Sequence, residues 1–127
     1  MRKIIIALFV LTLASTALAG DQCTAANSQA VAFVKETVTV STSSIGLTLA
    51  TYQPTTGQKA IEALVTVATS SIRVWYDGSA PTSTVGHLFA PGQTFVVCQA
   101  GLPLLKMIRD TSAAADAPVS VTYFEQK

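Results

Sequence analysis

The chain has 127 residues and a formal net charge of +1, and only 12% of its residues are charged. A chain of this length folds as one small domain, and a charge so close to zero gives no indication of the basic surface that nucleic-acid binding requires. Threonine, serine, alanine and valine are abundant, and a composition rich in β-branched residues favours strands over helices.

The first nineteen residues have the pattern of a secretory signal peptide. Two cations, Arg2 and Lys3, precede an apolar run at 4–13, and the segment closes on Ala17-Leu18-Ala19. A charged start, an apolar run and an A-x-A ending together indicate a cleavable export signal. An uncleaved membrane anchor is the alternative, but it would need about 20 apolar residues. We therefore expect a signal-peptide helix at 1–19, cleaved after Ala19, and no membrane attachment afterwards.

Cleavage would leave residues 20–127 as a single domain that carries six cations and seven anions. Both cysteines, Cys23 and Cys98, lie in this domain. In an oxidising compartment an even number of cysteines usually means a disulfide, whereas a closed zinc site needs four ligands. The sequence therefore predicts a Cys23–Cys98 disulfide in an exported protein, either periplasmic or extracellular.

Alternation of apolar and polar residues marks the candidate strands, with turn-forming residues between them. They lie at residues 37–41, 46–49, 61–67, 72–77, 85–89, 94–98 and 119–124, while 30–34 and 102–109 are ambiguous. The clearest strand is 61–67, and the short polar link after it predicts a hairpin with 72–77. Seven or eight short antiparallel strands indicate an all-β domain, a β-sandwich or jelly-roll-like fold.

Two turns are predicted from glycine positions. Gly78 follows Asp77 at the end of one strand, where a glycine supplies the positive φ that a tight turn needs. Ala90-Pro91-Gly92-Gln93 has proline and glycine in the order of a type II turn.

The sequence has none of the patterns that carry catalysis, cofactor binding or metal binding. It contains no G-x-S-x-G, P-loop, paired-histidine or EF-hand pattern. His87 is the only histidine, and a general base needs a positioned partner. We therefore expect a protein that is not an enzyme, with no catalytic residue, no cofactor and no metal.

Four residues form the candidate interaction surface: Arg73, Trp75, Asp77 and His87. Arg73 and Trp75 share one face of the strand at 72–77 and point outward if the other face is buried. An exposed tryptophan beside an arginine is typical of interface anchors and of carbohydrate-stacking platforms. The structural alternatives are a cation–π pair of Arg73 over Trp75, a turn built by Asp77, and a packing or surface role for His87.

Several segments resemble a family of small bacteriophage virion-associated β-sandwich proteins. They are Ala63-Leu64-Val65-Thr66-Val67, then Ile72-Arg73-Val74-Trp75-Tyr76-Asp77-Gly78-Ser79-Ala80-Pro81-Thr82, then Val85-Gly86-His87, Ile108-Arg109 and Val121-Thr122-Tyr123. The resemblance extends over about residues 59–124. It implies a structural role in a particle or assembly and transfers no active-site residue. The family's members generally lack a signal peptide and a disulfide, which is where this chain departs from them.

Together these features predict an exported, non-enzymatic structural or interaction module that binds a protein partner or itself. A surface, assembly or virion-like role is expected. The alternative is a periplasmic or secreted module that binds a glycan or small ligand through Trp75, Tyr76 and the loop 79–83. No nucleic-acid partner is expected.

Overall fold

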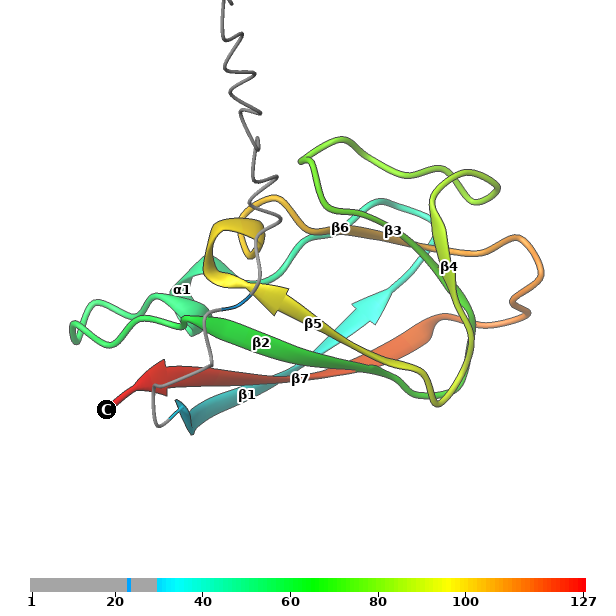
Figure 1. The fold of residues 1–127 in the computed structure, drawn as a ribbon. Coiled ribbons are helices and arrows are strands. Elements are labelled where there is room, and N and C mark those ends of the chain that lie inside the picture. The colour runs from blue at the N-terminus through cyan, green and yellow to red at the C-terminus, as the bar shows by residue number, and fades with distance from the viewer. Residues whose placement is uncertain (1–22, 24–29) are drawn as a thin grey trace, which may run out of the picture.

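The structure is a computed structural model that describes residue 23 and residues 30–127. In this part of the chain, seven strands form two antiparallel sheets that pack face to face. Figure 1 shows β6, β3 and β4 lying over the layer that contains β2, β7 and β1. The predicted all-β fold is confirmed, whereas the predicted signal peptide at 1–19 lies outside the described residues.

The strands divide unequally between the two sheets. The larger sheet has the order β1 (Ala30–Val40), β7 (Ala117–Gln126), β2 (Glu62–Val67) and β5 (Thr94–Cys98). The smaller sheet has the order β4 (His87–Phe89), β3 (Ile72–Trp75) and β6 (Lys106–Arg109). Two short helices, α1 (Leu49–Tyr52) and the 3-10 helix η1 (Gln99–Gly101), lie in the connections.

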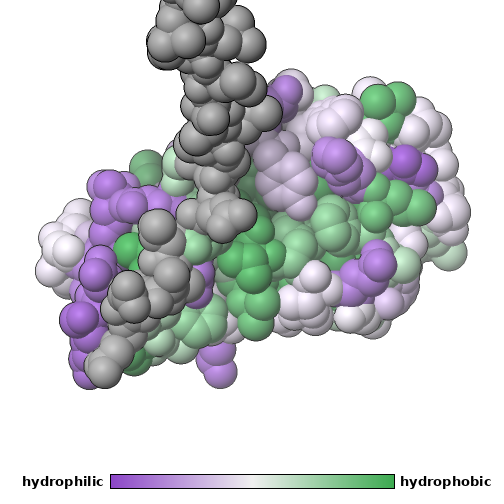
Figure 2. Space-filling model, in the orientation of Figure 1, coloured by the Kyte–Doolittle hydropathy of each residue, from purple (hydrophilic) through white to green (hydrophobic). Residues whose placement is uncertain are grey.

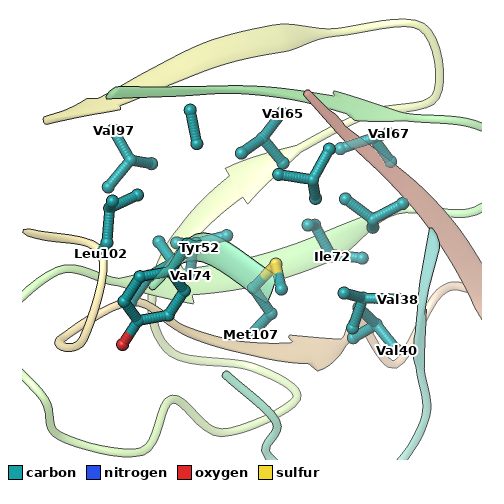
Figure 3. Close-up of a cluster of buried hydrophobic side chains, with 14 of the residues drawn as sticks. Val38, Val40, Tyr52, Val65, Val67, Ile72, Val74, Val97, Leu102 and Met107 are labelled. Carbon is teal, nitrogen blue, oxygen red and sulfur yellow. The ribbon is translucent and has the colours of Figure 1, made fainter. Parts of the chain in front are cut away.

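The core lies between the sheets and is built largely from alternate residues of β1, β2, β3 and β7 (Figure 3). In β2 the predicted apolar face is buried completely at Ala63, Val65 and Val67. Burying a valine-sized side chain contributes about 1.5–3 kcal/mol, so this core dominates the stability of the fold. Its main members are Val38, Val40, Ala63, Val65, Val67, Ile72, Val74, Val97, Met107, Val119, Val121 and Tyr123.

The predicted hairpin between 61–67 and 72–77 is wrong. Strand β2 pairs with β7 and β5, whereas β3 lies in the other sheet and pairs with β4 and β6. The link between β2 and β3 contains Thr69-Ser70-Ser71 but no glycine, and two-residue hairpin turns usually require residues that accept positive φ. The chain therefore passes between the two sheets here, and both strands bury their apolar faces in one core.

The N-terminal strand is longer than predicted. The ambiguous segment 30–34 and the predicted strand 37–41 form one continuous strand, β1, paired with β7. Its register shifts between Ala32 and Val34, which is the signature of a β-bulge. The bulge explains why the alternation in the sequence breaks in the middle of a single strand.

The predicted strand at 46–49 is also wrong. Only Ile45 pairs, in an isolated bridge with Met107, and α1 begins at Leu49. At Gly46 the chain passes so close to the carbonyl oxygen of Leu105 that an added Cβ would lie 3.1 Å from it. This close crossing turns the chain across the end of the sandwich and prevents a longer strand. In the ambiguous segment 102–109, only β6 is a strand.

One side of the sandwich is closed by backbone hydrogen bonds. Ile45 and Met107 exchange two bonds of 2.8 Å, and the Arg109 N–H donates to the Ser41 carbonyl at 2.8 Å. The segment 41–45 thereby covers the outer edge of β6. On the opposite side the sheets end at β4 and β5, which are joined by the predicted turn 90–93 with Gly92 at φ +82°. We call the surface formed by β4 and β5 with Trp75 and Tyr76 the open side.

The predicted disulfide joins Cys23 to Cys98 at the end of β5, with 5.0 Å between the two Cα atoms. The two cysteines are 75 residues apart, and closing a loop of that length stabilises a fold by about 4 kcal/mol in the chain-entropy model. Disulfides persist in oxidising compartments, so the bridge favours a location outside the cytoplasm. Of the helices in the described residues, none has the length and apolarity needed to cross a bilayer.

Candidate interaction surface

Arg73 faces outward from the smaller sheet, as predicted, but its guanidinium is engaged within the molecule. Its Nε donates to Asp110 Oδ2 at 2.5 Å, and its Nη1 donates to the Gly86 carbonyl at 3.2 Å. The side chain is 23% exposed. Arg73 therefore connects β3 to the loop before β4 and to the end of β6. No cation–π contact of Arg73 with Trp75 occurs among the described residues.

The carboxylate that pairs with Arg73 belongs to Asp110, which the sequence analysis missed. Asp110 is 4% exposed, and its Oδ1 also accepts from the N–H of Ser112 at 2.9 Å and from its hydroxyl at 2.5 Å. These Ser112 bonds, followed by the bond from Arg73, lower the pKa of Asp110 to about 2. The Asp-x-Ser pattern, shared with Asp77-Gly78-Ser79, was the signal that could have revealed it.

The loop between β3 and β4 folds back over the outer face of the smaller sheet. Pro81 is buried in it, and the Ser83 carbonyl accepts from the Thr111 N–H at 3.0 Å. Gly86 has φ +134°, and an added Cβ would lie 3.2 Å from Pro81 Cβ and 3.3 Å from Arg73 Cβ. Pro81 and Gly86 therefore hold this loop against the sheet. Strand β4 accordingly starts at His87, later than predicted.

Asp77 builds the turn after β3, as its alternative interpretation predicted. Its Oδ1 accepts from the Ser79 N–H at 2.9 Å and from the Ser79 hydroxyl at 2.5 Å. These bonds lower the pKa of Asp77 below its usual value. Gly78 adopts φ +86° beside it. The carboxylate is thus committed to local hydrogen bonds at an exposed position.

Trp75 and His87 are brought together at one end of the open side. Their rings meet edge to face, with centroids 5.2 Å apart. Trp75 is half-buried and His87 is exposed. The His87 ring also lies 5.8 Å from that of Tyr76, and burial raises the pKa of Tyr76.

The ring contacts continue from the smaller sheet to the larger one. Tyr76 meets Phe95 of β5 with centroids 6.1 Å apart, and Phe95 meets Phe89 of β4 at 4.3 Å. The five rings form what we call the aromatic run, which consists of Trp75, His87, Tyr76, Phe95 and Phe89. It follows the open side from β3 to the turn between β4 and β5 and gives this side an aromatic lining.

Each of the two outer strands of the open side also exposes one large aliphatic side chain. Leu88 lies opposite Arg73 on the outer face of the smaller sheet, and Val96 lies opposite Leu64 on the outer face of the larger sheet. Leu88 of β4 and Val96 of β5 are each 52% exposed. Figure 2 shows hydrophobic residues gathered across the middle of the face that carries β5 and β4. Neither residue belongs to the interaction surface that was predicted from the sequence. The uncharged stretch Thr94 to Cys98 was the signal available for Val96.

Two depressions over the described residues lie away from this surface. One of about 440 Å³ is lined by β1 and β7, including Lys35, Glu36 and Ser120. Another, of about 270 Å³, is lined by the β6–β7 connection and Thr42. No group of three or more His, Cys, Asp or Glu side chains suited to a metal occurs within residues 23 and 30–127.

A polar contact at the core edge joins two sheet residues, Glu36 of β1 and Tyr123 of β7. The Tyr123 hydroxyl donates to Glu36 Oε1 at 2.5 Å, and Glu36 also accepts from the Thr48 N–H at 3.2 Å. Burial, followed by the bond to Glu36, raises the pKa of Tyr123 far above its usual value. Glu36 therefore provides the hydrogen-bond acceptor that the buried Tyr123 hydroxyl needs, which is a structural role.

Of the four predicted surface residues, Trp75 and His87 lie in contact with each other. Arg73 is bonded to the loop before β4, and Asp77 accepts hydrogen bonds within its own turn. No family model matches this chain, and the searches of curated proteins and of solved structures also gave no match.

Proposed function

We propose that this protein is an exported, non-enzymatic interaction module that binds another protein through its open side. One observation carries this function: the aromatic run lies along the open side between the outer strands β4 and β5, and each of these strands also exposes one aliphatic side chain, Leu88 or Val96. Contiguous exposed apolar surface marks interaction sites, because leaving it in water is unfavourable. Aromatic residues are also enriched in the cores of protein interfaces.

Two further features support an assembly role outside the cytoplasm. The resemblance to phage virion-associated β-sandwich proteins supports a structural, surface or virion-like role. The Cys23–Cys98 disulfide and the export pattern of residues 1–19 support a periplasmic or extracellular location. The Asp110–Arg73 pair and the docked loop hold Trp75 and His87 on a rigid frame, which reduces the entropy that binding would cost.

Site-specific photocrosslinking tests the proposed surface. The full chain is expressed in cells with Leu88→p-benzoylphenylalanine, and a matched variant carries Thr37→p-benzoylphenylalanine. Thr37 is exposed on β1, at the opposite edge of the larger sheet. We expect a discrete protein adduct from position 88 and none from position 37. Equal labelling from both positions, or no adduct from position 88, would contradict the proposed function.

Glycan binding is a second candidate function, favoured by one observation. Trp75, Tyr76 and His87 lie together beside the loop 76–86, and aromatic rings of this kind can stack on sugars. A glycan array with the wild-type chain tests this candidate, and Trp75→Ala should abolish any signal. A signal that persists in this variant would exclude the Trp75 site.

A further inference from the structure

Hydrogen bonding in β5 leaves some of its backbone groups directed away from the sheet. The Gln99 N–H donates to the Ile61 carbonyl, just before β2, at 2.7 Å. In an antiparallel strand, every second residue directs its N–H and C=O groups to the same side. Val97 and Phe95, two and four positions before Gln99, therefore also face β2. Gln93 also faces β2, because its carbonyl accepts from the Val67 N–H at 2.9 Å. Thr94 and Val96 alternate with these residues, so their N–H and C=O groups point outward from the edge.

The other described sheet edges carry features that oppose pairing with a further strand, whereas the part of β5 from Thr94 to Val97 has no charge, proline or bulge. Natural edge strands are commonly protected by charges, bulges, short length or a covering segment. Strand β1 has Lys35 and a bulge, β4 has only three residues, and β6 is covered by Ile45. Strand β5 has the sequence Thr-Phe-Val-Val-Cys, which contains no charge and no proline.

The edge of β5 is complementary to itself about a two-fold axis at Phe95. In that register Thr94 lies opposite the partner's Val96, and Val96 lies opposite the partner's Thr94. All outward N–H and C=O groups of these two residues then pair with those of the second copy. Phe95 meets the partner's Phe95, which extends the aromatic run across the axis. Since β5 has no charged residue, the pairing brings no like charges together.

We propose that the open side binds a second copy of this chain by antiparallel pairing of the two β5 edges. The proposal rests on the proposed function, because it assigns the partner of the same surface. A two-fold contact uses the same patch on both copies and is complete at two copies. The larger sheets of the two copies would thereby join into one continuous sheet.

The test measures the mass in solution of the full chain, expressed in an oxidising compartment and purified with its disulfide. Light scattering after size-exclusion chromatography should give twice the mass of a single chain for the wild type. Val96→Pro should give the mass of a single chain, because proline removes an outward N–H without removing a bond to β2. The matched control is Leu64→Ser, which alters the exposed side chain opposite Val96 on β2 and should keep the doubled mass.

A second variant protects the test against misfolding of the proline variant. Val96→Lys leaves the backbone intact and introduces a charge at the edge, so it should also lose the doubled mass while its circular dichroism spectrum stays that of the wild type. Amide hydrogen exchange should show Thr94 and Val96 protected in the wild type and exposed in Val96→Lys.

Three results would overturn the proposal. They are a wild-type chain with single-chain mass, a doubled mass that both Val96 variants retain, and protection of the Val96 amide in a single chain, which would assign the edge to another segment of the same molecule. A photocrosslink from position 88 to a different protein, with the chain itself a single copy, would overturn the self-pairing and leave the proposed function standing. The absence of any adduct from position 88 would contradict the function instead.

Discussion

At the scale of single residues, two aspartates with the same local pattern have different environments. Asp77 and Asp110 each accept two hydrogen bonds from the serine two positions later. Asp77 is exposed, whereas Asp110 is 4% exposed and also binds Arg73. Substitutions of the two aspartates can therefore be compared directly. Both change the same kind of local turn, but only a substitution of Asp110 also breaks an ion pair.

Asp110→Asn should destabilise the fold more than Asp77→Asn does. The first change leaves the guanidinium of Arg73 without its charged partner, and breaking such a partly buried pair costs about 2–3 kcal/mol. The second change affects only an exposed turn and should have a much smaller effect. Urea unfolding of both variants measures the difference. Equal losses would show that the ion pair contributes nothing beyond the turn.

The Asp110 contribution should also depend on pH. The folded pKa of about 2 lies below the ordinary 3.8, so the folded state favours the charged carboxylate. The stabilisation is therefore fully present above the ordinary pKa and is lost as the pH falls through the folded pKa. Urea unfolding between about pH 6 and pH 2 should show that the difference in free energy of unfolding between the wild type and Asp110→Asn becomes smaller below about pH 4. A difference that does not change with pH would contradict the assignment of this stabilisation to the Asp110 carboxylate.

At the scale of elements, turns were easier to predict than strand partners. The positive φ of Gly78 and Gly92 follows from local sequence, and both turns are confirmed. The partner of β2 does not follow from local sequence, because any strand with a buried apolar face could occupy the neighbouring position. The long final strand β7 lies beside β2, and β3 lies in the other sheet.

Docking of the β3–β4 loop should depend on Gly86. Gly86→Ala combines a strained φ of +134° with contacts of 3.2 Å to Pro81 Cβ and the Val74 carbonyl. We expect a loss of about 2–4 kcal/mol, since strain and overpacking each cost about 1–3 kcal/mol. The control is Gly92→Ala, which has φ +82° and no neighbour within 4 Å and should cost about 1 kcal/mol. Thermal and urea unfolding measure the stability of both variants. Similar losses of stability in Gly86→Ala and Gly92→Ala would show that the loop is not packed closely against the sheet.

At the scale of the whole molecule, the disulfide joins segments that are distant in sequence. Cys23→Ala, Cys98→Ala and the double variant should each lose about 3–4 kcal/mol of stability, because any of them opens the same long loop. Non-reducing mass spectrometry of the wild type should show a chain lighter by the pair of hydrogens lost on oxidation. Free thiols on both residues would exclude the bridge, and losses that add in the double variant would show that the cysteines act separately.

The sandwich as a whole has one closed side and one open side, and this difference arises from contacts between segments that are distant in the sequence. The bridge between Ile45 and Met107 depends on two segments that are 62 residues apart meeting at the edge of β6. No periodicity in either segment encodes that meeting. Likewise, Phe89 and Phe95 meet in the aromatic run only because β4 and β5 are neighbouring outer strands of two different sheets.

The sequence by itself determined the all-β class, the buried faces of β2, β3 and β7, the glycine turns and the pairing of Cys23 with Cys98. Each of these follows from side-chain alternation, from the φ that glycine permits, or from the presence of only two cysteines. Only the tertiary structure decided the strand order, the Arg73–Asp110 pair and the open side. These depend on contacts between distant segments, whose free energy arises from the shared core and is not encoded in any local pattern.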